Sequence, residues 1–373
     1  MRIAICTDQY LPMLSGLVDS VETLAIELRL QGHAVRIYAP GMPGSVPEEN
    51  VVRFPAWAVP GSRGGAFISI PLGAMTDMRA FRPDIVHTHL FGGVGLFAWY
   101  AARCLHVPLI GTDHTFPADY LYDLNFWPFP YLARKYAAWF YGRCDLVTTP
   151  SERMLEELRI YGMKKPARII SNPIVRAFRP LTNKSELKKK RGIDGHAILI
   201  FGRIAKEKNL DFALKVFSQV ATHSDVELIF IGDGPLRDTL EQRVRKETFS
   251  DRIRFLGILR GEALVEAINA CDVVLITSTS ESQSMTLLQA MACGLPTVVA
   301  RAGGLPEYVW DDVSGYVVPP TETKIFADRL MTILEDPLLA KNLGDAGRRS
   351  VVPYTPGTIA KQFLEIYGAL IVD

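Results

Sequence analysis

The stretch from residue 278 to residue 300, STSESQSMTLLQAMACGLPTVVA, carries polar side chains whose spacing could serve chemistry. Glu281 lies in a polar loop, and Gln289 follows eight positions later, about two turns into a helix-forming segment. With that spacing, one side chain can reach one end of a polar ligand and the other side chain the opposite end. A surface glutamate and a solvated helical glutamine would show the same spacing, so this stretch alone leaves both interpretations open.

A second candidate site contains two cations, Arg203 and Lys208, five positions apart where a predicted strand turns into a helix. An arginine binds phosphate as a planar fork and a lysine as a point charge, so the pair could hold a diphosphate from two sides. Such pairs are also common on protein surfaces. Because the Glu281 loop lies in the same half of the chain, we favour the phosphate-binding interpretation.

The elements that position these residues follow an α/β pattern. Apolar runs at residues 197–201 and 273–276 predict buried parallel strands directly before Arg203 and before the Glu281 loop. Gly294 and Pro296 end the predicted helix before a further strand at residues 297–299. In such a unit, the loop at the carboxyl end of the strand opens into the ligand crevice, and the helix start directs unpaired N–H groups there. An anionic ligand with hydroxyl groups fits that geometry.

The first half of the chain repeats the pattern, with strands expected at residues 2–6, 35–38, 84–89 and 109–115. Two of these strands end in histidine-containing segments, DIVHTH and GTDHT. A strand-end histidine is more often a structural hydrogen-bonding residue, and we assign His87 and His106 to structure. The first turn, CTDQYLPMLSG, lacks G-x-G-x-x-G, which counts against a dinucleotide-binding oxidoreductase.

Composition limits the class of protein. A chain of 373 residues is too long for one core, and a net charge of +1 gives no overall field for nucleic acid, so we expect two domains and no nucleic-acid partner. Five scattered cysteines without C-x-x-C predict reduced thiols in the cytoplasm. We expect no signal peptide, and residues 90–102 are too short an apolar stretch to span a bilayer. Membrane contact would then be peripheral.

Taken in order, the motifs resemble family-4 retaining glycosyltransferases of the GT-B fold. Glu281 and Gln289 match the E-x7-E signature, except that glutamine replaces the second acid. Gly202 to Lys208 resembles the G-R-x-x-x-x-K donor motif, and AGGLPE at 302–307 resembles the G-G-x-P-E turn. Residues 15–18, SGLV, resemble the glycine turn near donor phosphate and acceptor, and His114 with Tyr120 matches H-T-x-x-x-x-Y.

The resemblance implies an α/β GT-B fold, in which two Rossmann-like domains face a central cleft and a C-terminal helix returns to the first domain. We place an acceptor-side domain at residues 1–175, a linker at 176–195, a nucleotide-sugar-binding domain at 196–355 and the returning helix at 356–373. Residues 314–319 fit the hairpin that usually follows the G-G-x-P-E turn. The run KKKR at 188–191 reads as a solvated face of the linker, with contact to acidic headgroups as the alternative.

The resemblance also implies roles for individual residues. In the family, the first glutamate contacts the donor sugar, the second acid contacts the nucleotide ribose, and the histidine approaches the sugar and the scissile bond. The implied catalytic residues are therefore His114, Glu281, Arg203 and Lys208. The implied donor-binding residues are Gly16, Arg203, Lys208, Gly232, Glu281, Ser282, Gln283, Ser284 and Gln289. No Asp-x-Asp motif is visible, and neither a metal nor a cofactor is expected.

The implied reaction moves a hexose from a nucleotide-diphosphate sugar, such as UDP-glucose, to a hydroxyl of a membrane lipid or a glycan, with retention of anomeric configuration. The segment from His114 to Tyr120 resembles members that glycosylate diacylglycerol. Residues 126–143, FWPFPYLARKYAAWFYGR, could lie at an anionic bilayer surface, although a helix packed on the sheet with its aromatics in the core explains them as well. The alternatives are a soluble or lipopolysaccharide-type glycan with a GDP-mannose donor, and a non-catalytic nucleotide-sugar binding module. The expected location is cytoplasmic, with peripheral contact to the inner face of the membrane.

Overall fold

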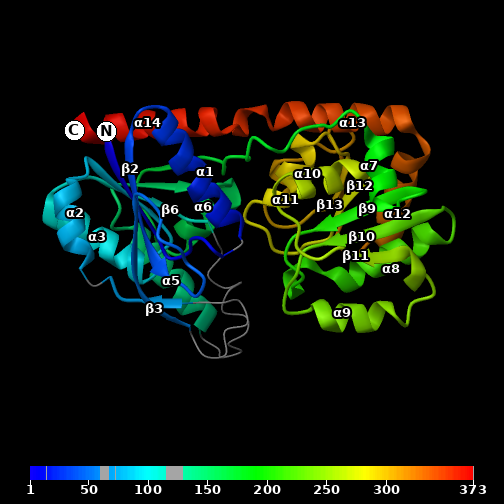
Figure 1. Cartoon of the computed structure of the whole chain (residues 1–373), viewed down its shortest axis with the longest axis horizontal. Helices are drawn as coiled ribbons and strands as arrows, with labels where there is room; N and C mark the ends of the chain where they lie inside the picture. The colour runs from blue at the N-terminus through cyan, green and yellow to red at the C-terminus, as the bar shows by residue number, and fades with distance from the viewer. Residues whose placement is uncertain (14, 59–66, 72, 115–128, 373) are drawn as a thin grey trace. The chain divides into compact units, whose positions relative to one another are not determined.

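The chain folds into two units, shown in a computed structural model that describes every residue except 14, 59–66, 72, 115–128 and 373 (Figure 1). The first unit comprises Met1–Pro173 and the C-terminal segment that begins at Tyr354, and the second comprises Ile174–Pro353. Each unit is built on its own sheet, as the alternation of apolar runs and helical segments in the sequence predicts.

The first unit contains an eight-stranded sheet in the order β4-β3-β2-β1-β5-β6-β7-β8. Neighbouring strands are parallel except for β3 and β4, which pair antiparallel at one edge. The strands are β1 (Arg2–Thr7), β2 (Ala34–Gly41), β3 (Val51–Ala58), β4 (Phe67–Ser69), β5 (Ile85–His89), β6 (Leu109–Thr112), β7 (Leu146–Thr149) and β8 (Ala167–Ile169).

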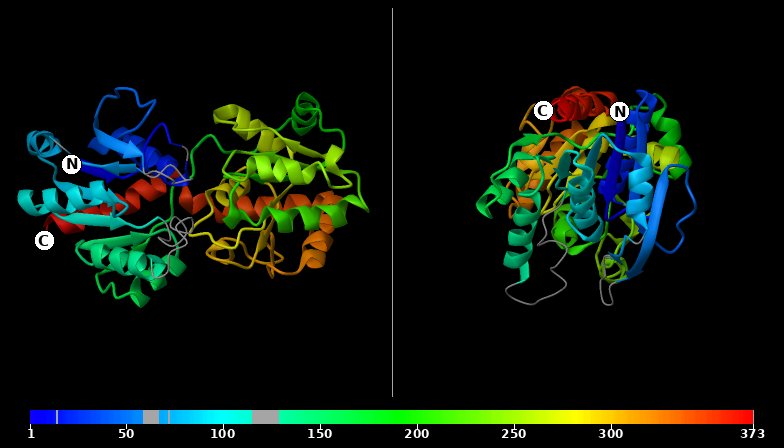
Figure 2. Two further views of the ribbon diagram at one scale, coloured as in Figure 1. Left: turned by 90° about the horizontal axis from the view of Figure 1, so that it is seen from below. Right: turned by 90° about the vertical axis from the view of Figure 1, so that its left-hand side faces the viewer.

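Helices bury both faces of this sheet (Figure 2). They are α1 (Gly16–Leu30), α2 (Ala74–Phe81), α3 (Gly93–Leu105), α5 (Phe129–Tyr141), α6 (Glu152–Ile160) and α14 (Pro356–Val372). Along β1, Ile3 and Ile5 join a core cluster with α1 and α14, whereas Ala4 and Cys6 join the cluster under α2, α3 and α5. This two-sided burial explains why the strand is a continuous apolar run. The helix α14 therefore belongs to the core of the first unit.

The second unit has a six-stranded parallel sheet in the order β11-β10-β9-β12-β13-β14. Its strands are β9 (His196–Phe201), β10 (Val226–Ile231), β11 (Ile253–Phe255), β12 (Val273–Ile276), β13 (Thr297–Ala300) and β14 (Tyr316–Val318). Its α-helices are α7 (Lys184–Arg191), α8 (Leu210–Ala221), α9 (Arg237–Val244), α10 (Gly261–Ala270), α11 (Met285–Ala292), α12 (Thr323–Glu335) and α13 (Pro337–Ser350). Short 3₁₀ turns are η1 (Lys206–Lys208), η2 (Ser250–Arg252), η3 (Leu305–Glu307) and η4 (Val352–Tyr354), the last of which spans the boundary between the two units.

Both sheets are doubly wound, because the strand order reverses within each of them. In the second unit the reversal falls between β9 and β12, and in the first between β1 and β5. Loops that follow the two strands at such a reversal diverge and leave a crevice at the carboxyl edge of the sheet. In the second unit, these are the loops that carry Arg203, Lys208 and Glu281.

The prediction of a hairpin at residues 314–319 is wrong. Strand β14 runs parallel to β13, with Val298 opposite Tyr316 and Ala300 opposite Val318. A tight turn precedes it, in which Trp310 O accepts hydrogen bonds from Ser314 N at 2.9 Å and from Val313 N at 3.0 Å. The apolar run Tyr316–Val318 is buried on both faces and so adds one more parallel strand to the sheet.

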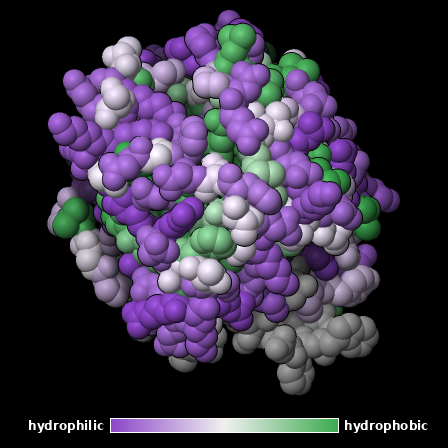
Figure 3. Space-filling model, turned by 90° about the vertical axis from the view of Figure 1, so that its right-hand side faces the viewer, coloured by the Kyte–Doolittle hydropathy of each residue, from purple (hydrophilic) through white to green (hydrophobic). Residues whose placement is uncertain are grey.

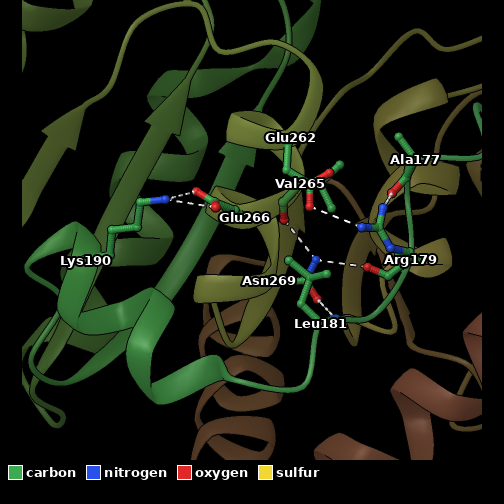
Figure 4. A network of polar contacts seen from close by, with 8 residues as sticks. All are labelled: Ala177, Arg179, Leu181, Lys190, Glu262, Val265, Glu266 and Asn269. Atoms are coloured by element: carbon green, nitrogen blue, oxygen red, sulfur yellow. Dashed lines mark hydrogen bonds and ion pairs between the residues drawn. The ribbon is translucent and has the colours of Figure 1, made fainter.

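The segment that enters the second unit is fixed to α10 by polar contacts (Figure 4). Asn269 Oδ1 accepts from Leu181 N at 2.8 Å, while Asn269 Nδ2 donates to Arg179 O at 3.1 Å and to Val265 O at 2.8 Å. Arg179 also pairs with Glu262 at 3.2 Å. These contacts hold this segment against the body of the second unit.

The basic run at 188–191 lies in α7 and pairs mainly with acids of the same unit. Lys188 Nζ lies 2.6 Å from Asp272 Oδ2, and Lys190 Nζ lies 2.7 Å from Glu266 Oε2 (Figure 4). Arg191 donates to the carbonyl of Ala263 at 2.8 Å. The run therefore joins α7 to the rest of the unit, and this geometry does not favour the alternative of acidic headgroups as its partner.

The face of the molecule drawn in Figure 3 is mainly hydrophilic, with hydrophobic residues in small separate groups. In the part of the chain that the structure describes, no helix is both long enough and apolar enough to cross a membrane.

Candidate active site

The second unit brings together two of the residues that the sequence singled out. Lys208 Nζ lies 2.5 Å from Glu281 Oε1, although the two residues are 73 positions apart. Lys208 ends the 3₁₀ turn after β9, and Glu281 lies in the loop after β12, so the reversal of the sheet places them side by side. Both side chains are largely buried, with exposed fractions of 21% and 10%. A cation and a carboxylate that the sequence placed in separate candidate motifs thus lie side by side.

The loops that carry this pair are bound to each other through the backbone. Thr277 Oγ1 donates to Lys208 O at 2.8 Å, and Thr279 N donates to Glu207 O at 3.0 Å. Thr277 is buried, so the first of these hydrogen bonds is shielded from water. The position of Lys208 is therefore fixed by the strand that leads to Glu281.

A glycine pair supports the Glu281 loop from its other side. Gly304 N donates to Glu281 O at 2.8 Å. Gly303 has φ +55°, and a Cβ at this position would lie 2.5 Å from Glu281 O and 2.7 Å from Glu281 N. A side chain at Gly304 would overlap the carbonyl oxygen of Ser282. Only glycine permits this close approach of the two backbones.

Arg203 lies at the same edge of the sheet but is more open. Its guanidinium pairs with Glu207 at 2.7 Å, and 47% of its side chain is exposed. Together with Gly202, Lys208, Thr277 and Thr286, Arg203 lines a hollow that is partly open to solvent. An exposed arginine with one carboxylate partner can exchange that partner for a phosphate.

The helix start after the Glu281 loop supplies further polar groups. Ser284 is the N-cap of α11, and its hydroxyl accepts from Leu287 N at 3.4 Å. Gln289 lies on the second turn of α11 and is only 5% exposed. Ser282 and Gln283 belong to the loop just before the cap. The free N–H groups of this first turn make it a site suited to an anion.

Gly232 acts through the absence of a side chain. It has φ +136° and follows β10, and a Cβ at this position would overlap the carbonyl oxygen of Gly202. The turns after β9 and β10 therefore approach each other closely beside Arg203.

His114 lies in the first unit, directly after β6, and is buried. Its Nε2 atom lies 2.8 Å from Nδ1 of His89, which ends the neighbouring strand β5. Asn172, whose Oδ1 accepts from Ser20 Oγ at 2.8 Å, also influences the pKa of His114. Gly16 is elsewhere in this unit, at the first position of α1, where Ser15 is the N-cap.

Burial keeps these histidines neutral. Desolvation lowers the pKa of His114 to about 4, although a smaller effect of the Asn172 side chain, which favours the protonated ring, opposes the shift. Desolvation, with a smaller effect of His114, lowers the pKa of His87 to about 3. The pKa of His89 falls well below its ordinary value for the same main reason, with His87 and His114 adding to the effect. This polar network cannot take up a proton near neutral pH.

Part of the predicted site lies outside the described residues. Thr115 and Tyr120 of the H-T-x-x-x-x-Y segment fall there, as do residues 126–128 of the aromatic and basic stretch. Residues Phe129–Tyr141 of that stretch form α5, and its side chains fit both interpretations. Phe140 and Tyr141 are buried in the core, whereas Tyr131 and Trp139 are about half exposed.

Three residues beside the candidate site residues were not predicted from the sequence. Thr277 and Glu207 connect the two loops of the second unit, and His89 pairs with His114 in the first. The signal for His89 was present, because two adjacent strands both end in histidine. That signal could be interpreted only with the parallel register, which places His89 opposite Thr112 and therefore close to His114.

Within the described part of the chain, no group of three or more His, Cys, Asp or Glu side chains is arranged to hold a metal ion. Two doubly wound units, the second of which has a cation and a carboxylate at its strand-order reversal, have the architecture of the GT-B fold.

Comparison with known proteins identifies the family. Residues 14–177 match the family described as Glycosyltransferase Family 4, and residues 183–350 match Glycosyl transferases group 1. An alpha-monoglucosyldiacylglycerol synthase of Streptococcus pneumoniae is 31% identical over 339 residues, which are 84% of this chain and 74% of the relative. A GDP-mannose-dependent alpha-mannosyltransferase of Mycolicibacterium smegmatis is 28% identical over 100% of this chain and 98% of its own length.

Among solved structures, Anabaena HepE in complex with UDP and glucose has a TM-score of 0.81 and 22% sequence identity, and the alignment covers 99% of this chain and 100% of HepE. The fold is thus confirmed as GT-B. The chain belongs to glycosyltransferase family 4 and is a hexosyltransferase.

Proposed function

We propose that this enzyme transfers a hexose from a UDP-linked donor to a hydroxyl of a diacylglycerol-based lipid, and that it does so without a divalent metal. The proposed binding of a nucleotide-sugar donor is supported by the contact between Lys208 and Glu281 at the strand-order reversal of the second unit. The support for the lipid part is the relative named alpha-monoglucosyldiacylglycerol synthase, together with the exposed face of α5.

The chemistry follows from where charge develops. Breaking the anomeric C–O bond leaves negative charge on the nucleoside diphosphate and positive charge on the sugar ring. Lys208, Arg203 and the N–H groups at the start of α11 can stabilise the departing diphosphate, and they contribute most in the transition state. These groups supply the positive charge that a divalent metal provides in other enzymes, which is why we propose metal independence.

Glu281 is assigned to the sugar hydroxyl groups. When a donor binds, the diphosphate replaces Glu281 as the partner of Lys208, and the carboxylate becomes available to accept hydrogen bonds from the sugar. His114 is assigned to the sugar side of the reacting bond, where a neutral imidazole does not repel the developing positive charge. Retention of configuration follows from family membership, and the acceptor would attack on the face that the diphosphate leaves.

The face of α5 that is turned to solvent suits a membrane surface. Tyr131, Leu132 and Trp139 are exposed, and Arg143 stacks on Trp139 with its guanidinium carbon 3.5 Å from the ring centroid. Lys135 adds a second cation beside Tyr131. Arg143 also lies over the ring of Trp99 on helix α3. The exposed residues of α3 extend this face, and they are Leu96, Tyr100 and Arg103. Aromatic rings with cations between them favour the headgroup region of an anionic bilayer.

One observation favours a second candidate. The GDP-mannose-dependent mannosyltransferase aligns with the whole of this chain, so GDP-mannose is the alternative donor, with a glycan or lipid as acceptor. Gln289 lies where the family has an acid that contacts the ribose, which is common to both nucleotides and does not separate them.

A transfer assay with radiolabelled donors tests the proposal. UDP-glucose and GDP-mannose are each offered with diacylglycerol in vesicles that contain phosphatidylglycerol, with and without EDTA. We expect an EDTA-insensitive glucolipid product from UDP-glucose. Product from GDP-mannose alone would replace the donor assignment, and activity that EDTA abolishes would contradict metal independence.

A further inference from the structure

The side chain of Tyr141 joins helix α5 to the end of strand β6. Its hydroxyl lies 3.1 Å from Thr112 O and 3.4 Å from Asp113 Oδ1. Thr112 is the last residue of β6, and Asp113 connects it to His114. A tyrosine hydroxyl has one proton to donate. Because both acceptors belong to the same two-residue segment, the hydroxyl is anchored there whichever of them receives the proton.

The ring of Tyr141 fits closely against the same strand. It is fully buried, and a Cβ at Gly111 of β6 would lie 2.8 Å from Cδ1 of the ring. Glycine at this position therefore lets the ring lie directly on the strand. Burial raises the pKa of Tyr141 well above its ordinary value, and the carboxyl group of Asp113 raises it further. The hydroxyl thus keeps its proton near neutral pH and acts as a donor.

Other hydrogen bonds hold this segment within the sheet. Asp113 N donates to Thr148 O of β7 at 3.0 Å, and Leu90 N donates to Thr112 O at 3.4 Å from the end of β5. Tyr141 reaches the segment from α5, a helix packed on one face of the sheet. Its hydroxyl therefore restrains the strand end in a direction that the neighbouring strands do not.

We propose that Tyr141 is a positioning residue for His114, because its hydroxyl fixes the end of β6 and the backbone there sets the place of the His114 ring. Without this hydroxyl, the strand end loses a contact from the helix side, and the ring occupies a wider range of positions. The consequence for the rate rests on the proposed function, in which His114 lies beside the reacting sugar. The restraint on the strand end does not depend on that function.

The test compares Tyr141→Phe with Tyr38→Phe as a matched control. Tyr38 is fully buried in the same core cluster, and its hydroxyl donates at 2.8 Å to Asp77, a residue of α2. Each substitution removes one buried hydroxyl and keeps the ring, so both variants should stay folded with similar losses in melting temperature. Thermal melting measures those losses.

The first readout needs no substrate. In protein that contains ¹³C-labelled histidine, the imidazole signals of His114, assigned with the His114→Asn variant, report the surroundings of this ring. We expect them to shift or broaden in Tyr141→Phe and to match the wild type in Tyr38→Phe. Unchanged His114 signals in Tyr141→Phe, or the same change in both variants, would overturn the proposal.

Steady-state kinetics give the second readout. In Tyr141→Phe we expect kcat to fall about tenfold and the donor KM to change by less than about twofold, since a displaced group slows the reaction more than it weakens binding. Tyr38→Phe should keep the wild-type kcat. Equal kcat values in the two variants would contradict a positioning role. If the wild type shows no transfer at all, the proposed function fails, while the histidine signals still decide whether Tyr141 positions His114.

Discussion

At the scale of single residues, the contact between Lys208 and Glu281 is the centre of the account. Two opposite charges 2.5 Å apart and largely shielded from water neutralise each other. Either residue without its partner would be a buried, uncompensated charge. A diphosphate and a sugar hydroxyl can satisfy both groups at once, so donor binding exchanges one set of partners for another.

Replacing Glu281 with glutamine keeps its shape and removes its charge. We expect kcat to fall by roughly 10²-fold, because a charged acceptor to the sugar is lost. Affinity for UDP should stay the same or increase, since Lys208 loses its competing partner. The control is Glu335→Gln, at the exposed end of α12. Near-wild-type turnover of Glu281→Gln would contradict the role assigned to this residue.

Gln289→Glu restores the acid that the family usually has at this position. If the side chain meets the ribose, a carboxylate should tighten UDP binding by about tenfold, the typical gain from a charge-assisted hydrogen bond. Because Gln289 is buried, the new charge should also lower the melting temperature of the free protein. Isothermal titration with UDP measures the first effect. A change in melting temperature alone would place Gln289 away from the nucleotide.

The sequence alone singled out candidate residues here, but it did not show which of them meet. Glu281, Arg203 and Lys208 were recognisable because each follows an apolar strand. The pairing of Lys208 with Glu281 depends on the order of the strands, since β9 and β12 are neighbours only after the sheet has formed. The contact between His89 and His114 could not be predicted either, because it depends on β5 and β6 being neighbours in the sheet.

At the scale of elements, the glycine turn after β13 holds the Glu281 loop in place. Gly303→Ala would put a Cβ 2.5 Å from Glu281 O, which the backbone can relieve only by moving the loop. Gly261 offers a matched control, because it has nearly the same φ, +54° against +55°, and no atom within 4 Å of a Cβ. We expect both alanine variants to lose about 1–2 kcal/mol of stability from the left-handed backbone.

Only Gly303→Ala should also lose transfer activity, by at least about tenfold, because Glu281 is displaced from the sugar. Melting curves and initial rates for the two variants separate these effects. Equal activity of Gly303→Ala and Gly261→Ala would show that the close packing of the turn does not position Glu281.

Element types followed from the sequence, but their packing did not. The apolar run at 316–318 was taken for part of a hairpin, and only its burial on both faces shows that it extends the parallel sheet. Helix α5 looked either like a core helix or like a surface helix. It is both, since Phe140 faces the core and Trp139 faces solvent, and a composition of aromatics and cations cannot reveal that division.

At the scale of the whole molecule, the buried histidines His87, His89 and His114 connect stability to pH. Each has a pKa lowered from about 6.5, so between pH 6.5 and about 4 the unfolded chain binds protons that the folded chain does not. The contribution of these histidines to the free energy of unfolding is therefore fully present above pH 6.5 and is lost as the pH falls. Each histidine should lower the free energy of unfolding by about 2 kcal/mol when the pH falls from 7 to 5.

Carboxyl groups with raised pKa values, such as that of Asp8, act in the opposite direction, so a variant must isolate the histidine effect. We expect His89→Asn to lose less stability than the wild type between pH 7 and pH 5, by about 2 kcal/mol. The exposed His223→Asn should lose as much as the wild type. Urea denaturation at the two pH values measures both. Equal losses in all three proteins would mean that His89 is not buried in its neutral form.

We propose that the second unit binds a nucleoside diphosphate through Lys208 without a metal. The most direct measurement is the melting temperature of the wild type and of Lys208→Ala with UDP and GDP, each with and without EDTA. Ligand at about 100 times its Kd stabilises the folded protein by about 2.7 kcal/mol, which such a measurement detects. We expect one nucleotide to raise the melting temperature of the wild type regardless of EDTA, and Lys208→Ala to lose most of that shift. No shift with either nucleotide, or the same shift in Lys208→Ala, would contradict the assignment of this site.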